Sequence, residues 1–146
     1  MRYLGIDFGI KRIGLAVSGP SGNMAFPLKT IVRTTRSAMF EELLGLIREQ
    51  NIEAIVLGIP LGSEGEENLT STQVLNFKES LERRTDLPVY LINEAFTSAE
   101  AKAIMIERGV RENRERQNLD QVAAVLILES FLSHREKDFN MVRENP

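Results

Sequence analysis

The sequence predicts a mixed α/β fold, with a five-stranded sheet that carries helices on both faces. The first observation is that three segments of alternating apolar residues come first and are joined by short connections, which is typical of an antiparallel meander. The second is that apolar strands then alternate with amphipathic helices, which is typical of parallel strands. The 146 residues contain no repeat or linker, so we expect a single domain over residues 1–133 and a frayed tail over 134–146.

The first three strands are expected at residues 2–8, 12–18 and 26–33, because apolar residues recur there at every second position. A helix follows, and we expect Ser37 to cap its N-terminus. Its apolar residues are spaced i, i+3, i+4 and i+7, which predicts one buried helix face. They are Phe40, Leu43, Leu44 and Ile47.

The second half alternates between strand and helix. Residues 54–59 form a continuous apolar run, which predicts a central parallel strand covered on both faces. A helix near 70–84 and a short buried strand at 88–92 come next, followed by a helix from Thr97 to Gly109. The last helix is expected over about 119–133. Right-handed crossovers would place the first strand at the centre of the sheet, with the two later strands parallel beside it.

Composition excludes several kinds of site. The chain has no cysteine, so thiolate metal sites are excluded. Its single histidine, His134, makes histidine-rich zinc sites and Ser-His-Asp triads nearly excluded. Any metal would be a hard cation held by oxygen, which indicates Mg²⁺ or Mn²⁺. No apolar run is long enough to span a membrane and no signal peptide precedes the first strand, so we expect a cytoplasmic protein without a membrane partner.

The net charge of −3 argues against a protein that coats nucleic acid without specificity, but the charge is unevenly distributed. Residues 1–40 carry six basic side chains and one acidic one, whereas residues 41–100 carry four basic and twelve acidic ones. The N-terminal region could therefore attract a polyanion. The alternative is an ordinary solvated charged face.

Asp7 is the first candidate for chemistry. It lies at the end of the first strand, on the face opposite Leu4 and Ile6, and Gly5 and Gly9 leave space for a ligand beside it. Lys11 and Arg12 follow in the turn, where they could contact phosphate oxygens. The alternative is an aspartate that only satisfies turn amides.

Two further carboxylates are predicted at the same sheet edge. Glu94 follows the strand at 88–92, and Asp120 begins an otherwise apolar helix whose small Ala123 and Ala124 permit close packing on the sheet. Three such carboxylates are typical of Mg²⁺-dependent phosphodiester hydrolysis. Taken singly, Glu94 and Asp120 could instead serve a helix dipole. Thr97 and Ser98 are helix caps, and a phosphate contact there is an option.

These residues resemble the motifs of one family. Residues 4–18 resemble the opening D-x-G-x-K-R-x-G-x-A-x-S motif of the YqgF family, also called RuvX. Residues 55–60 are similar to its I-V-V-G-L-P strand and 93–98 to its D-E-R-x-T-S motif. Residues 120–128 are similar to its closing D-x-x-A-A-x-x-I-L helix. The resemblance covers residues 1 to about 133.

The resemblance implies an RNase H-like fold and a hydrolase, a nuclease that matures the 5′ end of the 16S ribosomal RNA precursor in the cytoplasm. Asp7, Glu94 and Asp120 would be the catalytic and metal-binding carboxylates, with Mg²⁺ or Mn²⁺ as cofactor. Lys11 and Arg12 would contact phosphate. Partners would be pre-rRNA or branched DNA and ribosomal precursor particles, with the chain a monomer or weak homodimer.

Other functions would use the same residues. A Holliday junction resolvase acting on DNA would use the same carboxylates. Asn93 and Ala95 replace the usual Asp and Arg beside Glu94, which leaves open a nucleic-acid-binding module of the same fold that lacks the chemistry. An actin-like ATPase also carries D-x-G, but it needs a second lobe for which 146 residues leave no room.

Overall fold

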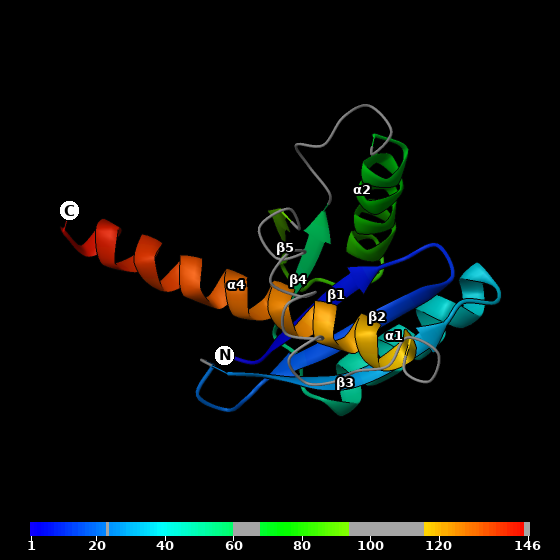
Figure 1. The fold of residues 1–146 in the computed structure, drawn as a ribbon, viewed down its shortest axis with the longest axis horizontal. Helices are drawn as coiled ribbons and strands as arrows, with labels where there is room; N and C mark the ends of the chain where they lie inside the picture. The colour runs from blue at the N-terminus through cyan, green and yellow to red at the C-terminus, as the bar shows by residue number, and fades with distance from the viewer. Residues whose placement is uncertain (23, 60–67, 94–115, 145–146) are drawn as a thin grey trace.

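A computed structural model describes residues 1–22, 24–59, 68–93 and 116–144. The described elements follow the predicted order of a meander and then alternating helices and strands (Figure 1). They are β1 (Tyr3–Phe8), β2 (Arg12–Ser18), β3 (Ala25–Val32), α1 (Arg36–Glu49), β4 (Ala54–Ile59), α2 (Asn68–Glu82), β5 (Val89–Asn93) and α4 (Arg116–Glu144). The helix expected from Thr97 to Gly109 lies outside the described residues.

The sheet has five strands in the order β3-β2-β1-β4-β5. Strands β1, β2 and β3 pair antiparallel, whereas β4 pairs parallel with both β1 and β5. The predicted mixed sheet is therefore confirmed, including the central position of the first strand; β4 lies between β1 and β5. The carboxyl ends of β1, β4 and β5 lie at one sheet edge because these three strands run in the same direction.

The sheet is the middle of three layers (Figure 1). One face packs against α1 and α2 through side chains such as Leu4 and Ile6, which are fully buried. The other face packs against α4 through Tyr3 and Val56. Burying a large aliphatic side chain stabilises the fold by about 1.5–3 kcal/mol, so these two apolar layers determine which face each β1 residue presents. In the described part of the chain, no helix is both long and apolar enough to cross a membrane.

The predicted cap of the first helix was wrong. The helix begins at Arg36, and Thr35 is its N-cap: the Thr35 side chain accepts a hydrogen bond from the backbone N–H of Ala38 at 3.1 Å. Thr35 has extended backbone angles, as an N-cap requires. Both Thr35 and Ser37 can cap a helix, and the apolar pattern does not distinguish two positions so close together.

Two later elements also differ from expectation. Strand β5 is an edge strand whose Tyr90 and Leu91 are 39% and 38% exposed, so it is not the buried strand that its apolar sequence predicted. Helix α4 does not end at 133 but continues to Glu144, where a frayed tail was expected, and this part projects past the sheet (Figure 1). The helix was expected to end at 133 because its apolar periodicity ends there. Residues 134–144 contain no glycine or proline, so no helix-breaking residue ends the helix earlier.

Candidate active site

Asp7 lies near the end of β1, on the face that packs against α4. Strand alternation places it on the side of Tyr3 and Gly5. The Tyr3 ring lies 5.6 Å from that of Phe131 in α4. A Cβ atom on Gly5 would lie 2.9 Å from the carbonyl oxygen of Ala124. Asp7 is half-buried, and it shares this face with Gly5, so its side chain lies on the α4 side of the sheet.

Gly14 brings Asp120 to the same place. Gly14 pairs directly with Asp7 across the β1–β2 ladder, so both positions face the same side of the sheet. A Cβ atom on Gly14 would lie only 2.1 Å from the carbonyl oxygen of Asp120 and 2.9 Å from its Cβ. Only glycine permits this approach of helix to sheet. Asp120 is therefore held over the strand position next to Asp7, about 4.8 Å away across the sheet.

Two side-chain contacts fix the beginning of α4. Nε of Arg12 donates to Oδ2 of Asp120 at 2.8 Å, and the two side chains are 29% and 23% exposed. Nε2 of Gln121 donates to Oγ1 of Thr30 at 3.1 Å. Thr30 is buried and pairs with Gly14, so this second bond is made from the neighbouring strand β3. Together they orient the Asp120 carboxylate and leave it partly accessible.

The turn after Asp7 is closed by its own backbone. The N–H of Gly9 donates to the carbonyl of Arg12 at 2.9 Å, and a Cβ atom on Gly9 would lie 2.5 Å from that oxygen. Nη1 of Arg33 donates to the carbonyls of Gly9 and Ile10 at 2.9 and 3.1 Å. Lys11 is exposed at the tip. The turn therefore holds one exposed cation close to the end of β1.

The structure brings together four predicted site residues: Asp7, Lys11, Arg12 and Asp120. Glu94, Thr97 and Ser98 lie outside the described residues. Arg12, expected to contact phosphate, bonds to Asp120.

Sequence reasoning missed the residues that support the site, which are Gly14, Thr30, Arg33 and Gln121. Glycine at position 14, inside an otherwise apolar strand, was the one available signal, since such a glycine often marks a close backbone approach.

The oxygen donors suit a small hard cation. Mg²⁺ keeps several waters and is usually held by one or two carboxylates together with substrate phosphates. The Asp7–Asp120 pair matches that donor set. In the described ranges, no group of three or more acidic or histidine side chains is gathered as a metal site.

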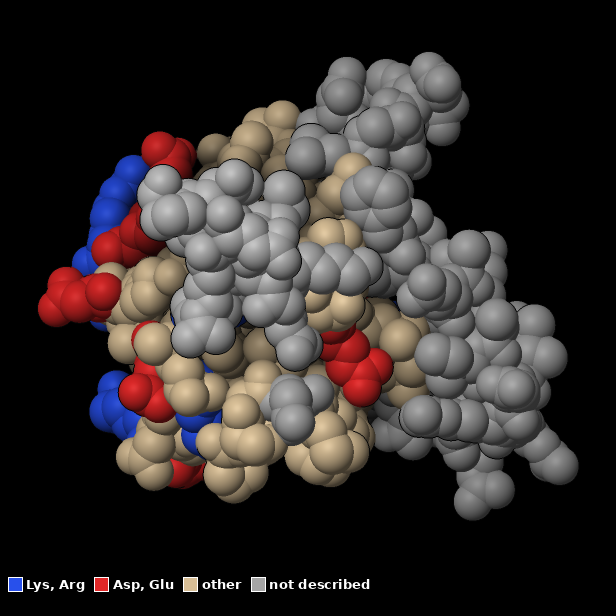
Figure 2. All heavy atoms as spheres, turned by 90° about the vertical axis from the view of Figure 1, so that its left-hand side faces the viewer, with Lys and Arg blue, Asp and Glu red and all other residues tan. Residues whose placement is uncertain are grey.

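Acidic and basic side chains are interspersed on the face of the molecule shown in Figure 2, and no broad basic area is visible among its described residues. Lys29 and Lys78 are paired with Glu42 and Glu82 at 2.6 and 2.9 Å. These lysines are thus locally neutralised. Attraction of a polyanion to the carboxylate pair depends on nearer cations, and among the described residues Lys11 is an exposed cation close to the pair.

The chain is similar in sequence to one family of known proteins. The model of the family described as "RuvX: Holliday junction resolvase" matches residues 1–134. A protein of Maridesulfovibrio salexigens named "Putative pre-16S rRNA nuclease" is 48% identical over 91% of this chain and 98% of its own. One of the same name from Nitratidesulfovibrio vulgaris (strain Miyazaki F) is 50% identical over 91% of this chain and 94% of its own.

Solved structures show the same fold. Thermus thermophilus RuvC in complex with a Holliday junction substrate superposes with a TM-score of 0.61 at 17% identity, covering 94% of this chain and 96% of that one. The fowlpox virus Holliday junction resolvase superposes with a TM-score of 0.54 at 14% identity, covering 92% and 99%. The RNase H-like fold expected from the sequence is confirmed, and so is the resemblance to one family: the chain belongs to the RuvX family.

Proposed function

We propose that this chain is a divalent-metal-dependent endonuclease that hydrolyses phosphodiester bonds in structured RNA, and that its substrate is the 5′ end of the 16S rRNA precursor. The observation that carries the proposal is the convergence of Asp7 and Asp120 over Gly14. The substrate is supported by the names of relatives about half identical to the chain. The cytoplasm and ribosomal precursor particles would be its setting.

The Asp7 and Asp120 carboxylates would hold Mg²⁺ or Mn²⁺. Such a cation supplies Lewis-acid polarisation of the phosphoryl oxygens. Lys11 would bind a phosphate of the same strand, since it is exposed at the turn beside Asp7. Arg12 would orient Asp120 through the 2.8 Å contact and offer its remaining N–H groups to the substrate.

Glu94 is proposed as the third carboxylate. It follows Asn93 directly in the sequence, and Asn93 ends β5 and pairs with Ile59 at the end of β4. The resemblance of residues 93–98 to the family motif is the second support. Thr97 and Ser98 are proposed, on that resemblance, as phosphate contacts.

A DNA junction resolvase is the second candidate, favoured by the family's description and by the likeness of fold to resolvases. Both substrates can be compared in one experiment. The full chain is incubated with an RNA that carries the 5′ flank of a 16S precursor and, separately, with a four-way DNA junction, each with Mn²⁺, Mg²⁺ or EDTA.

We expect cleavage of the RNA with either metal and none with EDTA. Cleavage of the DNA junction without cleavage of the RNA would show that the substrate is branched DNA and not RNA. Binding of either substrate without any cleavage would show a silent binding module and contradict the enzyme proposal.

A further inference from the structure

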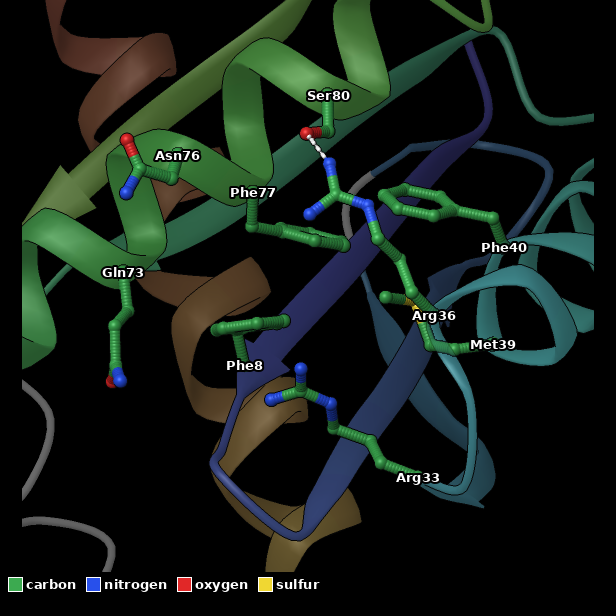
Figure 3. A pocket seen from close by; sticks show the side chains of 9 residues that line it. All are labelled: Phe8, Arg33, Arg36, Met39, Phe40, Gln73, Asn76, Phe77 and Ser80. Atoms are coloured by element: carbon green, nitrogen blue, oxygen red, sulfur yellow. Dashed lines mark hydrogen bonds between the residues drawn. The ribbon is translucent and has the colours of Figure 1, made fainter.

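A pocket with a volume of about 280 Å³ lies on the sheet face opposite α4, between α1, α2 and the end of β1 (Figure 3). Three phenylalanine rings form its aromatic wall. Phe8 and Phe77 stack with centroids 4.3 Å apart, and Phe40 and Phe77 with centroids 5.6 Å apart. Phe40 and Phe77 are buried, whereas Phe8 is half-buried. The wall is therefore rigid and continuous.

Three arginines lie against these rings, and two of them, Arg33 and Arg36, line the pocket, whereas the guanidinium carbon of Arg84 lies 4.0 Å from the centroid of Phe40. The guanidinium carbon of Arg33 lies 4.7 Å from the centroid of Phe8, and that of Arg36 lies 5.7 Å from the centroid of Phe40. Figure 3 shows the Arg36 guanidinium between Phe77 and Phe40, and the Arg33 guanidinium on the side of Phe8 that faces away from Phe77. Arg36 also donates to Oγ of Ser80. Aromatic faces attract cations, so the rings hold both groups in place.

The pocket has no internal counter-charge. None of the residues that line it is an aspartate or glutamate. Within the described ranges neither Arg33 nor Arg36 forms an ion pair. On the α2 side the rim carries two amides, Gln73 and Asn76, and Asn76 is exposed. An aromatic wall with two cations and neutral amide donors and acceptors selects a flat ligand that carries negative charge.

We propose that this pocket binds one nucleotide of an unpaired segment of the nucleic-acid substrate. Because the rings stack on one another and are covered by arginines, the base would stack on the guanidinium planes of Arg33 and Arg36. The phosphate would pair with the same two arginines, and the amides would meet the base edge. The volume is close to the lower end of the roughly 300–1,000 Å³ range of ligand pockets, so it admits a single nucleotide and excludes a duplex.

The pocket is connected to the carboxylate pair. Asp7 and Phe8 are consecutive residues of β1 and face opposite sides of the sheet. Arg33 also holds the turn that follows them, through the carbonyls of Gly9 and Ile10. A strand crossing this turn at Lys11 would reach both sides of the sheet. The inference rests on the proposed function. It assigns a substrate contact to the pocket lined by Phe8, the residue directly after the proposed catalytic Asp7.

The competing explanation is that the arginines only pack α1 against the rings. Asn76 separates the two explanations, because it is exposed at the rim and its side chain forms no hydrogen bond with the residues that the structure describes. Binding of a fluorescein-labelled single-stranded RNA is measured by anisotropy in EDTA, so that no cleavage occurs. Asn76→Glu should raise Kd by about 3–10-fold and Asn76→Lys should lower it, because phosphate contacts are electrostatic.

Arg36→Gln is the second variant, and Arg48→Gln, at the exposed far end of the same helix, is its matched control. Arg36→Gln should raise Kd and reduce the slope of log K against log[salt] by about 1, whereas Arg48→Gln should leave that slope unchanged. Equal Kd for both Asn76 variants, or equal slopes for both arginine variants, would overturn the proposal. Circular dichroism of each variant verifies that it is folded.

A second measurement identifies the ligand on the unaltered protein. The methyl group of Met39 lines the pocket, whereas that of Met24 is exposed elsewhere, so both serve as NMR probes. Adenosine 5′-monophosphate and the single-stranded RNA should each shift the Met39 signal, and inorganic phosphate should compete far more weakly. A response to phosphate alone would show an anion site without base recognition, and a response to the free nucleotide alone would show a site for a small molecule. Either result would overturn the assignment.

These binding measurements fail independently of the enzyme proposal. If RNA does not shift the Met39 signal but is still cleaved, the proposal that the pocket binds a nucleotide is wrong and the nuclease proposal stands. If the Asn76 and Arg36 variants change RNA binding as expected but the RNA is never cleaved, the pocket proposal stands and the nuclease proposal is wrong.

Discussion

Nε of Arg12 lies 2.8 Å from Oδ2 of Asp120, and this contact joins the first residue of β2 to helix α4 across 108 positions of sequence. The two ends of the domain thus meet at the candidate active site. A divalent cation bound by Asp7 and Asp120 would lie close to the guanidinium, and like charges at such distances repel. Arg12 therefore orients Asp120 and at the same time opposes metal binding.

The first prediction follows from that opposition. Arg12→Gln should increase affinity for Mn²⁺ by about 3–10-fold, because a partly buried unit charge next to the carboxylate is removed. Mn²⁺ binding is measured by electron paramagnetic resonance of the free ion. Lys11→Gln is the control: it removes an adjacent but exposed charge and should change the affinity less. Reduced Mn²⁺ affinity in Arg12→Gln would contradict this role.

The second prediction concerns the contact between helix and sheet. Gly14→Ala should reduce the free energy of unfolding by about 1–3 kcal/mol, because the new methyl would overlap the carbonyl of Asp120 and push α4 away. Urea denaturation measures this loss. Nuclease activity should decrease as well, since Asp120 moves with the helix.

Gly45→Ala is the matched control for that substitution. A Cβ atom on Gly45 meets nothing within 4 Å in α1, so alanine should stabilise the protein by about 0.5–1 kcal/mol through its higher helix propensity. Equal effects of the two substitutions would show that Gly14 does not set the approach of α4.

The third prediction tests the helix cap. Thr35→Ala should destabilise the fold by about 1 kcal/mol, because it leaves the N–H of Ala38 without its hydrogen-bond acceptor. Ser37→Ala, inside the helix, should change the unfolding free energy by less than half as much. Thermal or urea unfolding of the two variants decides between them, and the reverse order would reinstate Ser37 as the cap.

The fourth prediction concerns stability at high pH. Burial raises the pKa of the Tyr3 phenol above its ordinary value of 10.0, an effect that the nearby Arg135 partly opposes. The folded state therefore holds this proton more tightly than the unfolded chain does. Its contribution to stability is complete below pH 10.0 and is lost as the pH rises through the raised pKa.

Tyr3→Phe should accordingly lose less stability than the wild type between pH 9 and pH 11, about one unit either side of the ordinary phenol pKa. The measurement is the difference in urea midpoints, which cancels the titration of lysines common to both proteins. Parallel curves for the two proteins would show that the Tyr3 pKa is the same in the folded and unfolded states.

Much of the fold could be predicted because apolar periodicity and crossover handedness constrain strand order. These rules predicted that the strand of Asp7 ends at the same sheet edge as the two later strands, β4 and β5. They could not show that Arg12 bonds to Asp120, since a contact across 108 positions depends on how α4 crosses the sheet. Nor could they show the exposure of Tyr90, because a continuous apolar run has the same appearance in a central and in an edge strand.

The aromatic wall of the pocket could not be predicted from the sequence either. Phe40 was predicted as a core residue of its helix and is buried as expected, and Phe77 of α2 is buried too. The packing of α1 beside α2 brings these two rings into a stack and places Arg36 against Phe40. Helix periodicity gives the buried face of each helix but not its neighbour.

The most direct test of the active site is the rate of RNA cleavage in Mn²⁺ by Asp7→Asn and Asp120→Asn, with Asp86→Asn as the control. Asp86 is an exposed carboxylate outside the site. If Asp7 and Asp120 hold the metal, each of their variants should lose at least about 100-fold in rate, comparable to the loss of a group that stabilises transition-state charge, while RNA binding is retained. Asp86→Asn should cut as the wild type does. Wild-type cleavage by Asp7→Asn or Asp120→Asn would contradict the assignment of these two carboxylates as the catalytic pair.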